Sequence, residues 1–187
     1  TGVSIAGADA SHALSVVLNA NTAATGSIDL NNAAIDSRGG NITLNAGSGA
    51  SGNISNIGNI NASGSGGTLT VNLGGTAGQV AGTKISGATA LTKSGTGTLT
   101  LSENNDYTGA TTVQAGTLAV TGTNAGISNS SDVLLGNGGN GAATLDLTGI
   151  AETVKSLSRN GSGSTGTLTV KLDNGGSLTA SGNIDLT

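Results

Sequence analysis

Three sets of glycines have the Gly-X-Gly-X-X-Gly spacing of a dinucleotide-binding loop. These sets are Gly47, Gly49 and Gly52; Gly136, Gly138 and Gly141; and Gly161, Gly163 and Gly166. Such a loop cradles a pyrophosphate only where it joins a strand to a helix, because the helix N-terminus supplies the donors. No helical periodicity follows any set, and glycine accounts for 34 of the 187 residues. We therefore interpret them as turn glycines and predict no cofactor.

Side chains that could act as bases, acids or metal ligands are few and dispersed. His12 is the only histidine and the chain has no cysteine, so neither a transition-metal site nor a serine–histidine pair has its usual members. Asp29, Asp146 and Asp185 each lie between two aliphatic residues, which predicts that they face solvent on strands and stack only if their strands align. The sequence nominates no catalytic residue and no metal ligand, and we expect no enzyme.

Two turns have some of the residues of a cation site. Segment 136–141 has the glycines of a calcium-binding nonapeptide but lacks the aspartate that supplies hard oxygen ligands. The turn that holds Glu103 and Asp106 is the better candidate. An Asx turn explains it more simply. We expect Tyr107, the single aromatic residue, to pack over a corner of the fold.

Threonines recur at alternate positions of several predicted strands and could form an outward ladder. The candidates are Thr68, Thr70, Thr98, Thr100, Thr167 and Thr169. A flat threonine face would suit ice binding, whereas threonine is also the ordinary choice for the exposed side of a strand. Ala119, Asp146 and unequal spacings interrupt the rows, which argues against an ice-binding face.

The composition restricts both the core and the partners. Aromatic residues make up 1% and charged residues 9% of the chain, and the formal net charge is −4. The six basic residues are scattered singly, so the clustered positive charge that nucleic acid requires is missing. Without large side chains the core must be thin and built from Leu, Ile, Val and Ala.

A repeated Gly-Thr-Leu strand start organises the chain. Its copies span 67–71, 97–101, 116–120, 143–147 and 166–170, at a mean interval of about 25 residues, typical of stacked repeats. Each copy alternates aliphatic and polar residues, so Leu99 and Leu101 should point inward and Thr98 and Thr100 outward. Further strands are predicted at 27–30, 41–44, 111–113, 132–135, 153–157 and 183–186.

These patterns predict an all-β fold, a right-handed parallel β-helix with almost no helix. A sandwich is less suitable, because its core needs bulky side chains between two sheets. Ile54, Ile57 and Ile60 recur every third residue, and the surrounding glycine and asparagine favour a tight strand corner over a helix. We treat residues 1–187 as one solenoid: 1–90 with looser rungs, 91–120 with a sharper repeat, and 121–187 with the rungs that follow.

Residues 91–120 resemble the autotransporter-associated β-strand repeat, also called the passenger-associated transport repeat. The resemblance lies in a Gly-Thr-Leu-Thr-Leu strand, an Asn-rich turn to Tyr-Thr-Gly, then Thr-Thr-Val and Gly-Thr-Leu. Segments 143–149 and 153–157 are similar to the rungs that follow such a repeat. Segment 39–62, with Gly-Gly-Asn-Ile-Thr-Leu, more loosely resembles solenoids of the filamentous-haemagglutinin type.

The resemblance implies a segment of an autotransporter passenger, exported through an outer-membrane translocator and displayed at the bacterial cell surface or secreted. Its repeat would support secretion and folding, and the role would be structural or adhesive toward an unknown host or surface ligand. The alternatives are a self-assembling extracellular filament, an ice-binding threonine face and, least favoured, a carbohydrate-active β-helix enzyme. The sequence has no initiator Met or signal segment, so we expect a piece of a longer protein.

The two ends of the sequence have the composition of strands. Neither 1–7 nor 181–187 has a proline, a helical pattern or a charge cluster that would cap a solenoid. Open edges of stacked strands pair with other edges. We therefore expect the isolated segment to associate end to end, as a result of the cut and not of its biology, with growth restrained at low salt by Asp9 and Asp185.

Overall fold

The structure, a computed structural model, describes residues 4–7, 12–20, 25–62, 66–87, 89–121, 126–138, 141–161 and 165–187. These ranges contain 21 short strands and no helix, and every strand pair that they form is parallel. The predicted all-β fold, a parallel β-solenoid, is confirmed. Among the described residues no helix is long and apolar enough to cross a membrane.

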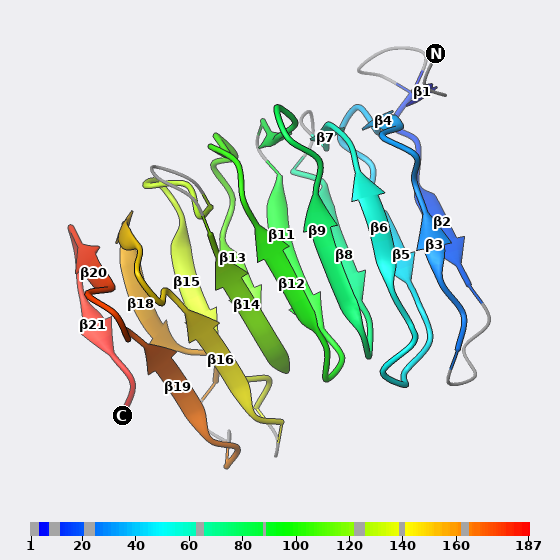
Figure 1. The fold of residues 1–187 in the computed structure, drawn as a ribbon. Coiled ribbons are helices and arrows are strands. Elements are labelled where there is room, and N and C mark those ends of the chain that lie inside the picture. The colour runs from blue at the N-terminus through cyan, green and yellow to red at the C-terminus, as the bar shows by residue number, and fades with distance from the viewer. Residues whose placement is uncertain are drawn as a thin grey trace.

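Two long sheets form two of the faces, and the chain visits them in turn, once per rung. The first sheet has eight strands, β2 (Val16–Asn19), β5 (Ile42–Asn45), β8 (Thr68–Asn72), β11 (Ala90–Ser94), β13 (Thr111–Val113), β15 (Asp132–Leu135), β18 (Ser156–Arg159) and β21 (Ile184–Asp185). The second has seven, β3 (Ile28–Asp29), β6 (Ile54–Ile57), β9 (Thr76–Gln79), β12 (Thr98–Leu101), β14 (Gly116–Val120), β16 (Ala143–Asp146) and β19 (Leu168–Lys171). The rungs lie side by side along one axis, with the chain termini at opposite ends (Figure 1).

The third face is interrupted. At one end it consists of β1 (Ser4–Ala6), β4 (Ala34–Asp36), β7 (Ile60–Asn61) and β10 (Ile85–Ser86), and at the other of β17 (Ala151–Val154) and β20 (Ser177–Ala180). Between these two sheets the chain crosses twice without a described strand, at 102–110 and at 126–131. Backbone hydrogen bonds still join the first crossing to β10, from Asp106 N–H to the Ile85 carbonyl at 3.2 Å and from Thr108 N–H to Gly87 at 2.8 Å.

Inward side chains form aliphatic columns through the solenoid. In the first sheet Ile42, Leu69 and Leu91 lie in register and are buried. In the second, Leu99 and Leu118 are aligned and buried, whereas Thr98 faces outward. The predicted inward and outward alternation is confirmed. One inward position in the first sheet holds a charged residue, Lys93, whose exposure is 0%.

The structure corrects the grouping of the Gly-Thr-Leu copies. Leu69 lies in the first sheet and Leu99 in the second, so these two copies do not belong to one column. Leu145 is aligned with Val170, two residues beyond the Leu168 that the motif suggested. The reason is variable rung length: Leu91 lies opposite Thr111, 20 residues on, and Leu157 opposite Ile184, 27 residues on. A fixed period therefore cannot assign columns.

The isoleucine triplet forms the predicted strand corner. Ile54 and Ile57 bound β6, which has a register shift where it pairs with β9. Asn56 within this strand has a φ of 54°, the left-handed conformation that asparagine tolerates. Ile60 then begins β7, and all three isoleucines are buried.

Close approach of backbone between rung corners requires glycine at some positions and not at others. A Cβ on Gly52 would overlap the carbonyl group of Gly47, whereas a Cβ on Gly78, within β9, would meet no atom within 4 Å. We predict that Gly52→Ala lowers the unfolding free energy by more than about 2 kcal/mol. Gly78→Ala should be neutral or stabilising by up to about 1 kcal/mol. Urea denaturation of both variants checks this, and equal effects would contradict the close approach.

Candidate functional site

The described members of the glycine triplets lie in turns and connections between strands. No helix follows any of their described members. Gly136 and Gly138 have positive φ values of 96° and 75°, and Gly161 has 84°, as expected for turns. Gly163 and residues 139–140 of the nonapeptide-like segment lie outside the described residues.

The acidic residues singled out from the sequence lie far apart. Asp29 is near one end of the second sheet and accepts a hydrogen bond from the Asn56 amide at 2.8 Å, which holds its carboxyl pKa below the ordinary value. Asp146 pairs with Lys171 at 3.3 Å on the same sheet, and Asp185 lies in the first sheet. His12 is exposed in the segment before β2. No group of three potential metal ligands occurs among the described residues.

The predicted threonine ladder is divided between the two long sheets. Thr68 and Thr70 lie on β8 in the first sheet, Thr98 and Thr100 on β12 in the second, Thr169 on β19, and Thr167 just before it. Two aligned outward rows do exist, Thr43, Thr70, Thr92 and Thr112 in the first sheet and Thr76, Thr98, Thr117, Thr144 and Thr169 in the second. The predicted set thus contributes three members to these rows.

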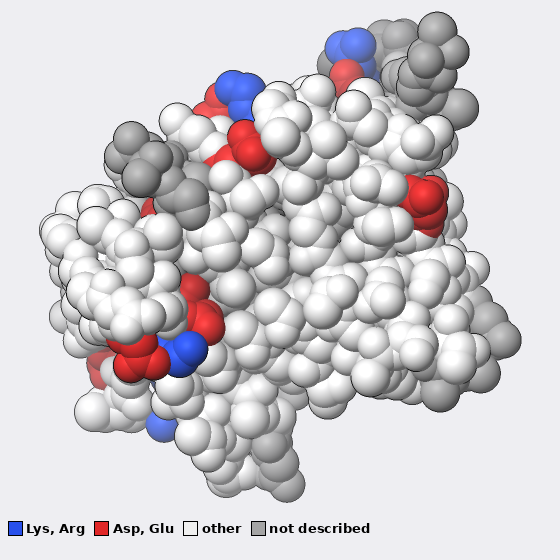
Figure 2. Space-filling view, viewed as in Figure 1, with Lys and Arg blue, Asp and Glu red and all other residues white. Residues whose placement is uncertain are grey.

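The longer threonine row is a single line and not a two-dimensional array. The neighbouring outward column of the second sheet reads Gly78, Thr100, Ala119, Asp146 and Lys171. Figure 2 shows that the middle of this side of the molecule is uncharged and that the coloured residues gather toward its ends and rim. The row offers hydroxyl groups on one edge of a neutral surface.

One buried polar side chain, Lys93 of β11, lies at the corner between the first and second sheets. This residue is aligned with Val71 and Val113 of the neighbouring rungs. Its Nζ donates to the carbonyls of Ser94 at 2.7 Å, Gly95 at 2.8 Å and Ala115 at 3.2 Å. Burial lowers the pKa of the Lys93 amine to about 8. The side chain therefore joins the corners of two successive rungs from inside.

Asn105 has the same function on the third face. Its Oδ1 accepts from Ile85 N–H at 2.8 Å, and its Nδ2 donates to the Gly126 carbonyl at 2.8 Å. It also exchanges hydrogen bonds with the Gln79 amide, at 2.8 and 3.2 Å. One buried side chain thus connects three rungs where no strand is present, whereas its neighbour Asn104 is exposed.

Tyr107 fills the core beside this amide and is fully buried, as predicted for a packing residue. Its hydroxyl is hydrogen-bonded to that of Thr111 at 2.7 Å, and Thr111 to that of Ser131 at 2.8 Å. Ser131 in turn donates to the Gly109 carbonyl at 3.0 Å. Desolvation raises the pKa of the Tyr107 phenol. The chain of hydroxyls connects the two strandless crossings.

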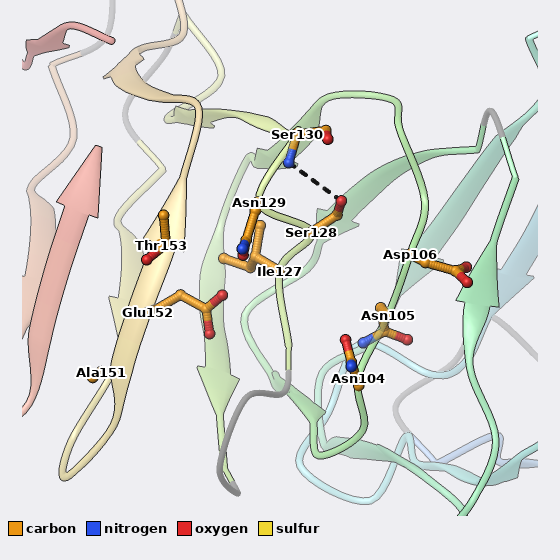
Figure 3. Close-up of a pocket in the computed structure, with 10 residues that line it drawn as sticks. All are labelled: Asn104, Asn105, Asp106, Ile127, Ser128, Asn129, Ser130, Ala151, Glu152 and Thr153. Atoms are coloured by element: carbon orange, nitrogen blue, oxygen red, sulfur yellow. Dashed lines mark hydrogen bonds between the residues drawn. The ribbon is translucent and has the colours of Figure 1, made fainter. Parts of the chain in front are cut away.

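A cavity of about 400 Å³ opens at the same place. Its walls come from the two crossings and from β17, and include Asn104, Asn129, Glu152 and Thr153. In Figure 3 the Glu152 carboxylate points toward the segment that holds Ile127 and Asn129. Glu152 accepts hydrogen bonds from the backbone N–H groups of Thr153 and Ile127, and desolvation raises its carboxyl pKa to about 7.

The sequence interpretation missed the two charged residues at inward positions. Lys93 follows Leu91 by two residues and Glu152 precedes Val154 by two, so the alternation of both strands assigns them to the core. This signal is present in the sequence. Their partners are backbone groups of other rungs and have no signature of their own.

The arrangement defines a parallel β-solenoid with one rung held to its neighbours by buried side chains. That rung is the segment recognised by comparison with known families: residues 91–120 match the model of the passenger-associated-transport-repeat. No curated protein and no solved structure matches the chain significantly. The repeat and the solenoid together fit an autotransporter passenger, and the predicted resemblance is confirmed for this segment.

The pKa of Glu152 makes a prediction about pH. The folded-state pKa of Glu152 is about 7 and its ordinary value is 4.5. Its contribution to the unfolding free energy is therefore complete below pH 4.5 and is lost as pH rises through 7. We expect the unfolding free energy to fall by about 1–3 kcal/mol between pH 4.5 and 8. Urea denaturation should show this loss in the native chain and not in Glu152→Gln.

Glu103→Gln serves as the control for this pH dependence, because it removes a carboxylate from the preceding crossing and leaves Glu152 in place. The aspartates whose pKa values are lowered, such as Asp132 and Asp146, act with opposite sign and below about pH 4. A slope that persists in Glu152→Gln would assign the effect to another group.

Proposed function

We infer that this chain is a non-catalytic segment of a bacterial passenger protein, displayed at the cell surface or secreted, with a structural or adhesive role. In this proposal the repeat at 91–120 supports secretion and folding by fixing the register of the rungs on both sides. The rest of the solenoid holds a binding surface away from the cell. Export would proceed through an outer-membrane translocator belonging to the parent protein.

The observation that carries this proposal is a set of buried polar contacts within the repeat. Lys93 makes them at the corner between the two long sheets, and Asn105 and Tyr107 make them at the third face. A slip of one residue would turn the aliphatic side chains of a rung outward, but a slip of two residues would keep them inward. Buried polar groups exclude the second slip as well, because it leaves them without partners. These contacts therefore support a role for the repeat as the place where stacking is fixed.

Asn105 and its exposed neighbour Asn104 provide a matched test. We predict that Asn105→Ala lowers the unfolding free energy by about 2–4 kcal/mol, since Ile85 N–H, the Gly126 carbonyl and the Gln79 amide all lose a partner. Asn104→Ala should change it by less than about 0.5 kcal/mol. In the full-length parent, the first variant should reduce the passenger reaching the surface and the second should not.

Surface display measured by protease accessibility of the parent protein checks the functional half of this prediction. A stability-matched core variant, Leu118→Ala, distinguishes a special role of the Asn105 contacts from general destabilisation. If Leu118→Ala reduces display as much as Asn105→Ala does, the repeat contributes only stability. If neither variant alters display, the proposed role in secretion is wrong.

A second candidate is end-to-end association of the isolated segment, and an extracellular filament is the function that such association would serve. The observation that favours it is the apolar surface of the last rung, β19, β20 and β21, where Leu172 is 43% and Ile184 is 54% exposed in the isolated segment. At the opposite end β2 forms the other edge of the sheet that contains β21. Docking of one end on the other is a head-to-tail contact, which extends without closing. Asp9 and residues 1–3 lie outside the described residues.

Adding charge to this edge tests self-association. We expect the native chain to show a mass that rises with concentration and Ile184→Lys to remain monomeric, because a lysine on an edge strand blocks pairing. Thr121→Lys adds the same charge at an exposed position within the solenoid and should associate like the native chain. Light scattering across concentration measures all three, and a native chain that stays monomeric would contradict the filament.

A further inference from the structure

The cavity beside β17 has acidic walls, and none of its described lining residues is a cation. Its lining residues carry amide, hydroxyl and carboxyl groups, and the only ionisable ones are Asp106 and Glu152. Asp106 is paired with Lys84 at 2.7 Å, and in Figure 3 it points away from Glu152. Glu152 therefore supplies the charge inside the cavity.

The position of Glu152 is unusual for a carboxylate. It occupies an inward place on β17, aligned with Leu178 of β20, and is 6% exposed. Among the described residues no Lys, Arg or His forms an ion pair with it. Two backbone N–H groups donate to it, which leaves acceptor capacity on a group that can take about four hydrogen bonds. A buried carboxylate is costly unless a cation accompanies it.

We propose that this cavity binds a protonated primary amine, with the Glu152 carboxylate as its ion-pair partner and the side-chain oxygen of Asn129 as a further acceptor. The ammonium group has three donors and no acceptor, which matches a wall of oxygens. The amine could belong to an amino sugar or to a lysine side chain of a protein partner. This site goes beyond the proposed surface role and does not depend on it.

Other ligand classes match these walls less well. A neutral sugar would leave the carboxylate without a cation, and the aromatic platform that sugars stack on is missing, since the single tyrosine is fully buried. A divalent cation prefers several carboxylates, and no group of three potential metal ligands occurs among the described residues. The other titratable groups at this place are the Asp106 carboxylate, which is paired with Lys84, and the Tyr107 phenol.

The tyrosine provides the measurement. The chain has one Tyr and no Trp, and desolvation, followed by the charge of Glu152, raises the pKa of the Tyr107 phenol, so its emission reports on the surroundings of Glu152. At pH 8, titration with ethanolamine and with ethylene glycol compares two molecules that differ only in an ammonium or a hydroxyl group. We expect the amine to bind at least about tenfold more tightly. The amino-sugar and lysine sources are compared with 6-amino-6-deoxy-glucose and N-acetyl-lysine amide, the tighter of which identifies the source.

Three variants decide the outcome. Glu152→Gln should abolish the preference for the amine, whereas Asp173→Asn, which removes an exposed carboxylate elsewhere, should retain it. Asn129→Phe, at an exposed position of the rim, should fill the cavity and abolish binding even if Glu152→Gln folds poorly, and it leaves Tyr107 as the emitting residue. Equal binding of amine and glycol, equal losses in Glu152→Gln and Asp173→Asn, or full binding by Asn129→Phe would each overturn the site.

Discussion

The described strands of this solenoid satisfy their backbone N–H and C=O groups on the rung before or after their own. A parallel strand cannot satisfy its hydrogen bonds within its own segment, so a rung that lacks a strand deprives both neighbours of partners. Buried unpaired groups are costly. The two crossings of the third face at 102–110 and 126–131 are therefore the places where the structure must be completed by other means.

Side chains supply the hydrogen bonds that strands would make at the two crossings, and the cavity results from the missing strands. Asn105 replaces the strand hydrogen bonds between β10 and the second crossing, while Tyr107 fills the core where an aliphatic column is missing. Loops cannot pack as closely as paired strands, so space remains between the crossings and β17. Glu152 then faces this space from a core position and accepts the N–H of Ile127. The repeat and the candidate site are thus two results of one interruption.

The fold followed from the sequence more fully than the site. Alternation in strands such as Leu99-Thr100-Leu101 identified inward positions, and small side chains excluded a thick core. The sequence did not predict which residues share a column. Rungs of 20 and 27 residues occur in one sheet, and the motif at 67–71 lies in a different sheet from that at 97–101. Lys93 and Glu152 occupy alternate strand positions that point into the core. Their partners, however, lie on other rungs at sequence separations that no pattern predicts.

Charge on the outside contributes to the structure differently from charge inside. The ion pairs Lys84–Asp106, Lys155–Asp132 and Lys171–Asp146 each join neighbouring rungs, but their side chains are largely exposed, so each contributes less than about 1 kcal/mol. Lys93, by contrast, cannot move without breaking three hydrogen bonds to backbone carbonyls. Register is therefore determined from within, and the outer faces can change their residues without altering the stacking. For a displayed protein this separation lets surface chemistry vary while the scaffold is retained.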